Sequence, residues 1–286
     1  MKYTFMAAHE QEFTVKQMSQ GLGVSRSGYY AWKQRSPSSR EKANAALLVE
    51  IRMAYQKSRK NYGSPRIHAY LRRKGHFCGR NQVARLMHQY QIVARKAHKS
   101  HPLTTQPRPG ARIAPNRLNR EFSAAFPNQK WVSDITYIGT AEGWLYLAVI
   151  MDLYSRCIVG WAMSEQIDEN LVEGAWQMAL LNRNPPSGLL HHSDRGSQYT
   201  SDDYQDQLAT LDCQVSMSRT GNCYDNAAME SFFATLKAEC VISSFQSKSE
   251  ACTAIFEYIE GWYNRHRLHS TLDYVSPVDF ERSSGH

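Results

Sequence analysis

The chain has 286 residues, of which 42% are hydrophobic, and its 34 Lys and Arg against 26 Asp and Glu give a net charge of +8. This length can bury a substantial core and suffices for one large domain or two or three small ones. No stretch approaches the ~18 consecutive apolar residues of a membrane helix, and the first residues lack the apolar segment of a signal peptide. We therefore expect a cytoplasmic protein without a membrane partner.

The charge is distributed unevenly along the chain. Residues 1–125 hold 24 basic and 5 acidic side chains, whereas residues 126–286 hold 10 basic and 21 acidic ones. The basic part predicts a polyanionic partner, most simply nucleic acid. The acidic part is unexpected in such a protein unless some of its carboxylates hold cations. The six scattered cysteines form no Cys-x-x-Cys pair, which argues against a zinc knuckle or a disulfide framework.

The first predicted domain, residues 1–38, contains a helix-turn-helix pattern over residues 13–35. Gly23 breaks the first helix, and Ser25 can cap the second. The second helix of this motif often enters the major groove, so Arg26, Ser27 and Tyr29 are candidate DNA contacts, to bases or only to phosphates. Two ordinary amphipathic helices would give the same pattern.

Residues 39–99 are predicted to form a basic helical DNA-binding domain, with Pro65 in the first turn of one helix. A run of positive charge is usually only a solvated face, but the near absence of acids here favours a phosphate-binding surface. The candidate DNA contacts are Arg66, Arg72, Arg73 and Arg80. Residues 100–127 form a Pro/Arg-rich linker.

Residues 128–245 change to strands that alternate with helices. Three strands are expected within 131–140 and 143–165, then a helix over 169–182, a strand ending near Asp194, a short helix, a strand over 213–219 and a helix that begins near Asp225. This order matches an α/β RNase H-like domain with a mixed five-stranded sheet. Residues 246–286 follow as a C-terminal helix and a packed coil.

Three carboxylates of this domain are candidates for one site. Asp134 lies inside an apolar strand, where a lone carboxylate is costly to bury, Asp194 follows a later strand, and Glu230 lies in an apolar helix. In an RNase H-like sheet the first strand lies beside the fourth, so these side chains can converge. Oxygen ligands favour Mg²⁺ or Mn²⁺ over zinc. Taken singly, a strand-end Asp such as Asp194 is more often a cap or a turn former.

Converging carboxylates with two divalent ions would suit in-line phosphoryl transfer. Lys237 lies two turns after Glu230 on the same helix face, where it could contact a phosphate.

The three carboxylates and their surroundings resemble a known family. Asp134, Asp194 and Glu230, with 35 residues between the last two, resemble the D,D(35)E pattern of retroviral integrases and insertion-sequence transposases. Six segments in order resemble the second reading-frame product of IS3-type transposases, from about residue 21 to residue 280: "YGSPRIHAYL", "WVSDITYI", "LYLAVIMDLYSRCIVGW", "HHSDRGSQY", "NCYDNAAMESFFATLKAE" and "YNRHRLHSTLDYVSPVDF".

The resemblance implies a role for each matching residue. Asp134 would bridge two Mg²⁺ ions, for which Mn²⁺ can substitute, while Asp194 and Glu230 would each bind one. Lys237 matches a position that contacts donor-end DNA. His192 either orients Asp194 or contacts the scissile phosphate, or it is simply a buried hydrogen-bonded histidine.

Other residues in the resembling segments have weaker assignments. His191 is expected to be structural. Asn226 and Ser231 would support Glu230, or only pack or cap. A group of basic side chains could line the DNA path, with a surface cluster as the default: Arg265, His266, Arg267 and His269.

The function implied by the resemblance is a Mg²⁺-dependent DNA transposase. It would cleave double-stranded DNA at insertion-sequence ends and join the 3′-hydroxyl to target DNA. It would assemble as a homo-oligomer on DNA, in the cytoplasm and associated with the nucleoid, and relatives are often fused to an upstream-frame product. Two alternatives stay open: a DNA-binding regulator without catalysis, and a metal-dependent nuclease that cuts without joining.

Overall fold

A computed structural model describes residues 1–95, 112–219, 223–241 and 244–283. The chain divides into two compact units, Met1–Met53 and Ala54–His286. Residues 100–111 of the predicted linker and the side chain of Cys223 lie outside the described residues. The division of the chain into five domains stays a prediction.

The first unit contains three short helices, α1 (Lys2–Ala8), α2 (Val15–Leu22) and α3 (Arg26–Lys33). Thr14 and Gln17 form a capping box at the start of α2, and Gly23 ends this helix at φ 63°, a conformation that glycine adopts without strain. Ser25 caps α3 by accepting from the amide of Gly28. The helix-turn-helix pattern over residues 13–35 therefore forms as predicted, and α1 precedes it.

Three further helices follow, α4 (Ser39–Lys57), α5 (Ser64–Arg73) and α6 (Arg80–Gln89). Pro65 lies in the first turn of α5, where its missing amide hydrogen costs nothing. Ile67 and Leu71 of α5 and Val83 of α6 are almost fully buried, and the two helices pack against each other. Their basic side chains lie outside this small core.

The second unit is built on a five-stranded sheet of β1 (Lys130–Thr140), β2 (Gly143–Asp152), β3 (Ile158–Ser164), β4 (Leu190–Ser193) and β5 (Gln214–Met217). The strand order is β3-β2-β1-β4-β5. The first three strands form an antiparallel meander, whereas β4 pairs parallel to both β1 and β5. This is the mixed five-stranded sheet of the predicted RNase H-like fold.

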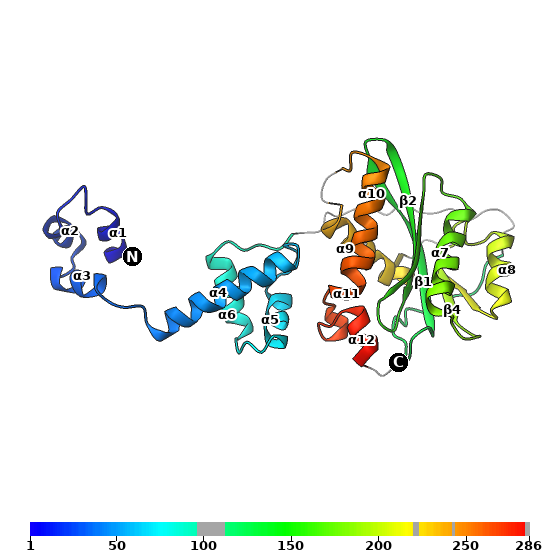
Figure 1. Cartoon of the computed structure of the whole chain (residues 1–286), viewed down its shortest axis with the longest axis horizontal. Coiled ribbons are helices and arrows are strands. Elements are labelled where there is room, and N and C mark those ends of the chain that lie inside the picture. The colour runs from blue at the N-terminus through cyan, green and yellow to red at the C-terminus, as the bar shows by residue number, and fades with distance from the viewer. Residues whose placement is uncertain (96–111, 220–222, 242–243, 284–286) are drawn as a thin grey trace. The chain divides into compact units, whose positions relative to one another are not determined.

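Helices cover both faces of the sheet (Figure 1). One face packs against α7 (Glu169–Arg183) and α8 (Asp202–Thr210), with a core that includes Trp131, Trp176 and Tyr204. Gly160 of β3 allows the close approach of α7, because a Cβ there would collide with the carbonyl oxygen of Ala175. The other face carries α9 (Ala227–Glu239) and α10 (Lys248–Phe256), which contact β1 and, for α10, also β2.

A 3-10 turn, Cys223–Asn226, directly precedes α9. After α10 the chain forms a π-helix (Glu257–Tyr263), a short α11 (Asn264–His266) and a second 3-10 turn, Ser270–Leu272. The tail was expected to be a packed coil, and this expectation is wrong: Pro277–Ser283 form α12. Ser276 accepts from the amide of Asp279 and thereby caps this helix. No helix in the described ranges has both the length and the apolar character needed to cross a membrane.

Candidate active site and DNA-binding residues

The parallel pairing of β1 with β4 brings Asp134 and Asp194 to the same level of the sheet. The last paired residues are Val132 and His192. Asp134 and Asp194 each lie two residues beyond this pair, so they reach the same edge on neighbouring strands. Because strand side chains alternate between faces, Val132 and Asp134 face the α9 side, opposite Trp131.

Asp134 is held by hydrogen bonds and surrounded by negative charge. Its carboxylate accepts from its neighbour's amide, Ile135 N, at 2.8 Å and from Asn226 Nδ2 at 3.1 Å. Burial raises the pKa of Asp134 well above its ordinary value, and the charges of Asp194 and Glu230 raise it further. The three carboxylates therefore interact across segments that are 60 and 36 residues apart in sequence.

Asp194 adopts a turn geometry of its own, because its Oδ1 accepts from the amide of Gly196 at 2.9 Å. The turn-former interpretation and the site interpretation are thus compatible. The carboxylate interacts with its own loop and also contributes to the field at Asp134.

Helix α9 supplies Glu230 and Lys237. Glu230 lies in the first turn and is exposed, and partial burial raises its pKa. Lys237, in the last turn, has its pKa lowered by burial, an effect that the Asp134 carboxylate opposes. Asn226, expected to support Glu230, instead contacts Asp134 and the carbonyl oxygen of Ser133 at 3.3 Å.

The donor set suits hard divalent cations, because it consists of carboxylate oxygens. Within the described ranges, however, no three His, Cys, Asp or Glu side chains are close enough to enclose a metal ion. Asp134 and Asp194 instead accept hydrogen bonds from backbone or amide N–H groups. A cation would relieve both the repulsion and the burial cost that raise the pKa of Asp134.

Both histidines of β4 are fully buried. His191 Nε2 lies 3.1 Å from Tyr204 Oη, and its ring packs edge-on against Trp176. His192 lies between two hydroxyls, at 2.8 Å from Ser216 Oγ and 3.1 Å from Ser218 Oγ. Burial lowers the pKa of His192 to about 4. His192 is therefore a buried, hydrogen-bonded histidine, and its role towards Asp194 or the scissile phosphate stays a prediction.

The basic candidates of the second unit fall into two groups. Arg72, Arg80 and Arg265 are exposed. Arg66, Arg73 and Arg267 make contacts within the protein, although Arg73 is also exposed. Arg66 Nε donates to the carbonyl oxygen of Leu268 at 3.0 Å, and Arg73 donates to that of Tyr274 at 3.1 Å.

Arg267 is the most deeply engaged of these arginines. It is 5% exposed and forms an ion pair at 2.9 Å with Glu239, which also accepts from Tyr258 Oη at 3.0 Å. The guanidinium therefore faces the interior, and its placement favours a structural role.

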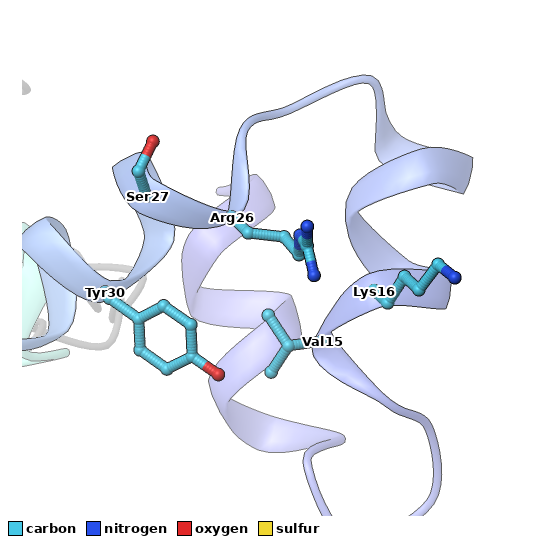
Figure 2. Close-up of a pocket in the computed structure, with 5 residues that line it drawn as sticks. All are labelled: Val15, Lys16, Arg26, Ser27 and Tyr30. Carbon is cyan, nitrogen blue, oxygen red and sulfur yellow. The ribbon is translucent and has the colours of Figure 1, made fainter.

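In the first unit, a cavity of about 560 Å³ opens between α2 and α3. Figure 2 shows Arg26 and Tyr30 extending from α3 towards Val15 at the start of α2. Lys16 and Ser27 also line this cavity. Tyr29, a candidate contact from the sequence, is fully buried and donates to Glu10. Tyr30, half exposed, occupies the accessible position instead.

Sequence reasoning missed Asp225, a fully buried carboxylate just before α9. Arg219 binds it with two guanidinium nitrogens, at 2.9 and 3.0 Å, and Arg120 and Asn116 bind it at 3.1 and 2.9 Å. These hydrogen bonds, led by those from Arg219, lower the pKa of Asp225. Asp225 thus holds the chain that enters α9 and positions Asn226. The signal available in the sequence was the acidic residue directly before Asn226, a candidate site residue.

Comparisons with known families agree with this architecture. The family described as "Integrase core domain" matches residues 124–223, and a second family with the same description matches residues 211–277. A family described as "HTH-like domain" matches residues 42–100.

Curated relatives match nearly the whole chain. It is 41% identical over 287 residues to "Transposase InsF for insertion sequence IS3A" of Escherichia coli (strain K12), covering 99% of each protein. It is 46% identical over 264 residues to "Insertion element IS600 uncharacterized 31 kDa protein" of Shigella sonnei, covering 92% of this chain and 97% of that protein. A chain in the cryo-EM structure of a simian T-cell lymphotropic virus intasome in complex with PP2A regulatory subunit B56 gamma aligns with a TM-score of 0.47 and 16% identity, over 74% of this chain and 73% of that one.

Proposed function

The chain belongs to the family of IS3 insertion-sequence transposases and is a DNA transposase with an integrase-like core, and from this membership we propose how its residues carry the reaction. Asp134, Asp194 and Glu230 are the catalytic carboxylates, and together they bind two Mg²⁺ ions or, in their place, Mn²⁺. The observation that carries this proposal is that Asp134 and Asp194 lie at the same level on paired strands, and that the charge of Glu230 raises the pKa of Asp134.

The reaction is strand cleavage at the ends of the insertion sequence, followed by transfer of the freed 3′-hydroxyl to another phosphodiester. When bound, the two ions would activate the attacking oxygen and stabilise the leaving oxygen of an in-line displacement. Asn226 orients the Asp134 carboxylate through its 3.1 Å hydrogen bond. Lys237, whose ammonium lies within the field of Asp134, contacts a phosphate of the donor end.

The first unit and the exposed arginines of the second unit supply the DNA contacts. The candidates that the structure leaves accessible are Arg26, Ser27, Arg72, Arg73, Arg80 and Arg265. Two transposon ends must be processed, so we propose that the chain acts as a homo-oligomer on DNA in the cytoplasm, close to the nucleoid. Fusion to or association with an upstream-frame product is part of the same proposal.

The test is joining of a labelled duplex that carries the element's own end, with Mg²⁺ or Mn²⁺. Asp194→Asn and Glu230→Gln should each reduce the amount of joined product by at least about a hundredfold, because an electrostatic contribution of a few kcal/mol is lost at the reacting phosphate. DNA affinity should stay close to that of the wild type. Asp203→Asn makes the same chemical change at an exposed site on α8 and should join normally.

Each alternative has its own outcome in this assay. Cut ends without joined product would indicate a nuclease. Binding without chemistry in wild type, with or without the upstream-frame product, would indicate a regulator. Normal joining by Asp194→Asn would refute the assignment of the site.

A further inference from the structure

A second pocket, of about 280 Å³, lies beside α9 and is distinct from the carboxylates described above. Its walls come from α9, from the end of β2 and the loop after it, from α5, and from the end of the π-helix and the segment that follows it. The polar side chains that line it are all basic or hydroxylic, and they include Arg66, Arg156, Ser231, Arg267, His269 and Ser270. No Asp or Glu is among the described residues that line it.

Two of the arginines carry charge without a counter-ion. Arg267 is neutralised by Glu239. Arg66 and Arg156, in contrast, bond only to carbonyl oxygens, those of Leu268 at 3.0 Å and Phe122 at 2.8 Å. Neither forms an ion pair with a described carboxylate, although both are partly buried. Burial lowers the pKa of both guanidinium groups, as expected where positive charge lacks compensation.

His269 adds an unpaired polar atom to the same wall. The residue is 8% exposed, and its Nε2 has no hydrogen-bond partner. Its ring packs edge-on against Tyr263, with centroids 4.9 Å apart. Burial, followed by the charges of Arg267, Arg66 and Arg156, holds the pKa of His269 well below its usual range. A buried polar atom left unpaired is destabilising, so a ligand that pairs it would remove this cost.

The chemistry of these walls fits a phosphate group. Guanidinium groups bind phosphate oxygens with parallel hydrogen bonds, and the hydroxyls and the imidazole can donate to further oxygens. The volume lies at the lower limit of the roughly 300–1,000 Å³ typical of small-molecule sites. A single phosphate group therefore matches it better than a whole nucleotide.

The pocket shares its helix with the proposed catalytic residues. Ser231 follows Glu230, and Ala227 follows Asn226, which holds Asp134. A strand anchored here would therefore pass along the same two turns of α9 that carry Glu230.

We propose that this pocket binds one phosphate of the DNA backbone and so fixes the strand next to the carboxylates, an inference that rests on the proposed transposase mechanism. The pocket is a positioning site, and its residues take no part in the displacement itself. Free inorganic phosphate has the same chemistry and is the competing source.

The test measures DNA affinity of the full chain against salt concentration. Each phosphate contact contributes a slope of about −0.9 in log K against log salt for duplex DNA. Arg156→Gln should make the slope shallower by about one contact. Arg282→Gln removes the same charge from an exposed position on α12 outside the pocket and should leave the slope unchanged.

A second variant avoids the risk that Arg156→Gln fails to fold. Ser231 is exposed on α9, and Ser231→Asp introduces an anion at the rim while leaving the core intact. Ser231→Asp should also make the slope shallower by about one contact. In a parallel thermal-unfolding experiment, inorganic phosphate should raise the midpoint of wild type but not of Ser231→Asp.

One result would overturn the proposal. Unchanged slopes in both pocket variants would show that no DNA phosphate binds here, and if phosphate still stabilised wild type, the pocket would be a site for the free anion. Joining assays separate this from the main proposal. Metal-dependent joining with unchanged slopes would leave the transposase mechanism intact, whereas changed slopes without joining would leave the phosphate pocket and remove the mechanism.

Discussion

Replacement of Arg267 by methionine should destabilise the second unit strongly, because it removes the partner of a buried carboxylate. Glu239 is only 8% exposed and accepts from Arg267 Nε at 3.1 Å and from a terminal guanidinium nitrogen at 2.9 Å. Tyr258 Oη alone would then satisfy it. Breaking a buried ion pair on one side typically costs about 3–5 kcal/mol.

The measurement is denaturant unfolding and thermal unfolding of wild type, Arg267→Met, Glu239→Leu and the double variant, both followed by circular dichroism. Apolar replacement of both partners is often neutral or stabilising, so the double variant should be more stable than either single one. At about 2–4 °C per kcal/mol for a unit of this size, Arg267→Met should melt roughly 10 °C below wild type.

Additive losses in the double variant, or a cost of less than about 1 kcal/mol for Arg267→Met, would refute this reasoning. Arg267 would then be a surface residue that is available to DNA, as one interpretation of the sequence suggested.

Two further predictions concern the sheet. The pKa of His192 is about 4 in the folded state against about 6.5 in an unfolded chain. The unfolded state therefore binds more protons between these values, and the free energy of unfolding should fall by roughly 3 kcal/mol as the pH drops from 6.5 to 4. Unfolding experiments at several pH values should show a weaker pH dependence for His192→Gln, and an unchanged dependence would contradict this prediction. Gly160→Ala should destabilise the fold by about 1–3 kcal/mol through overpacking, since the added Cβ would lie 2.7 Å from Ala179 N. The control is Gly21→Ala, where an added Cβ has nothing within 4 Å and should stabilise α2 slightly. Equal effects of the two variants on thermal unfolding would refute the close-packing argument.

The sheet could be predicted from the sequence because its signals are local. Strand periodicity identified β1 to β3, and the parallel pairing of β1 with β4 explains why Asp134 and Asp194 meet. The cap of α12 is also visible in the sequence as Ser276 before Pro277, a pattern that marks a helix start.

The DNA contacts could be predicted less well because they depend on partners far away in sequence. Neighbouring residues on a helix point about 100° apart, so the choice between Tyr29 and Tyr30 required the packing of α1, which buries Tyr29. Likewise, the sequence around Arg267 contains no sign of Glu239, 28 residues earlier. Residue type alone cannot distinguish a basic side chain that faces DNA from one that neutralises a buried acid.

The topology of the sheet also bears on the order in which activity arises during folding. The meander of β1 to β3 needs only contacts between neighbours in sequence, whereas β4 must insert beside β1 after an intervening helix. Pairings between distant segments form late, because the chain must lose the entropy of closing a long loop before the contacts of the pairing can stabilise it. Asp134 therefore gains Asp194 only when this late step is complete. We expect a nascent chain to acquire its DNA-binding helices well before its catalytic carboxylates are together, so that holding DNA precedes any capacity to cut it.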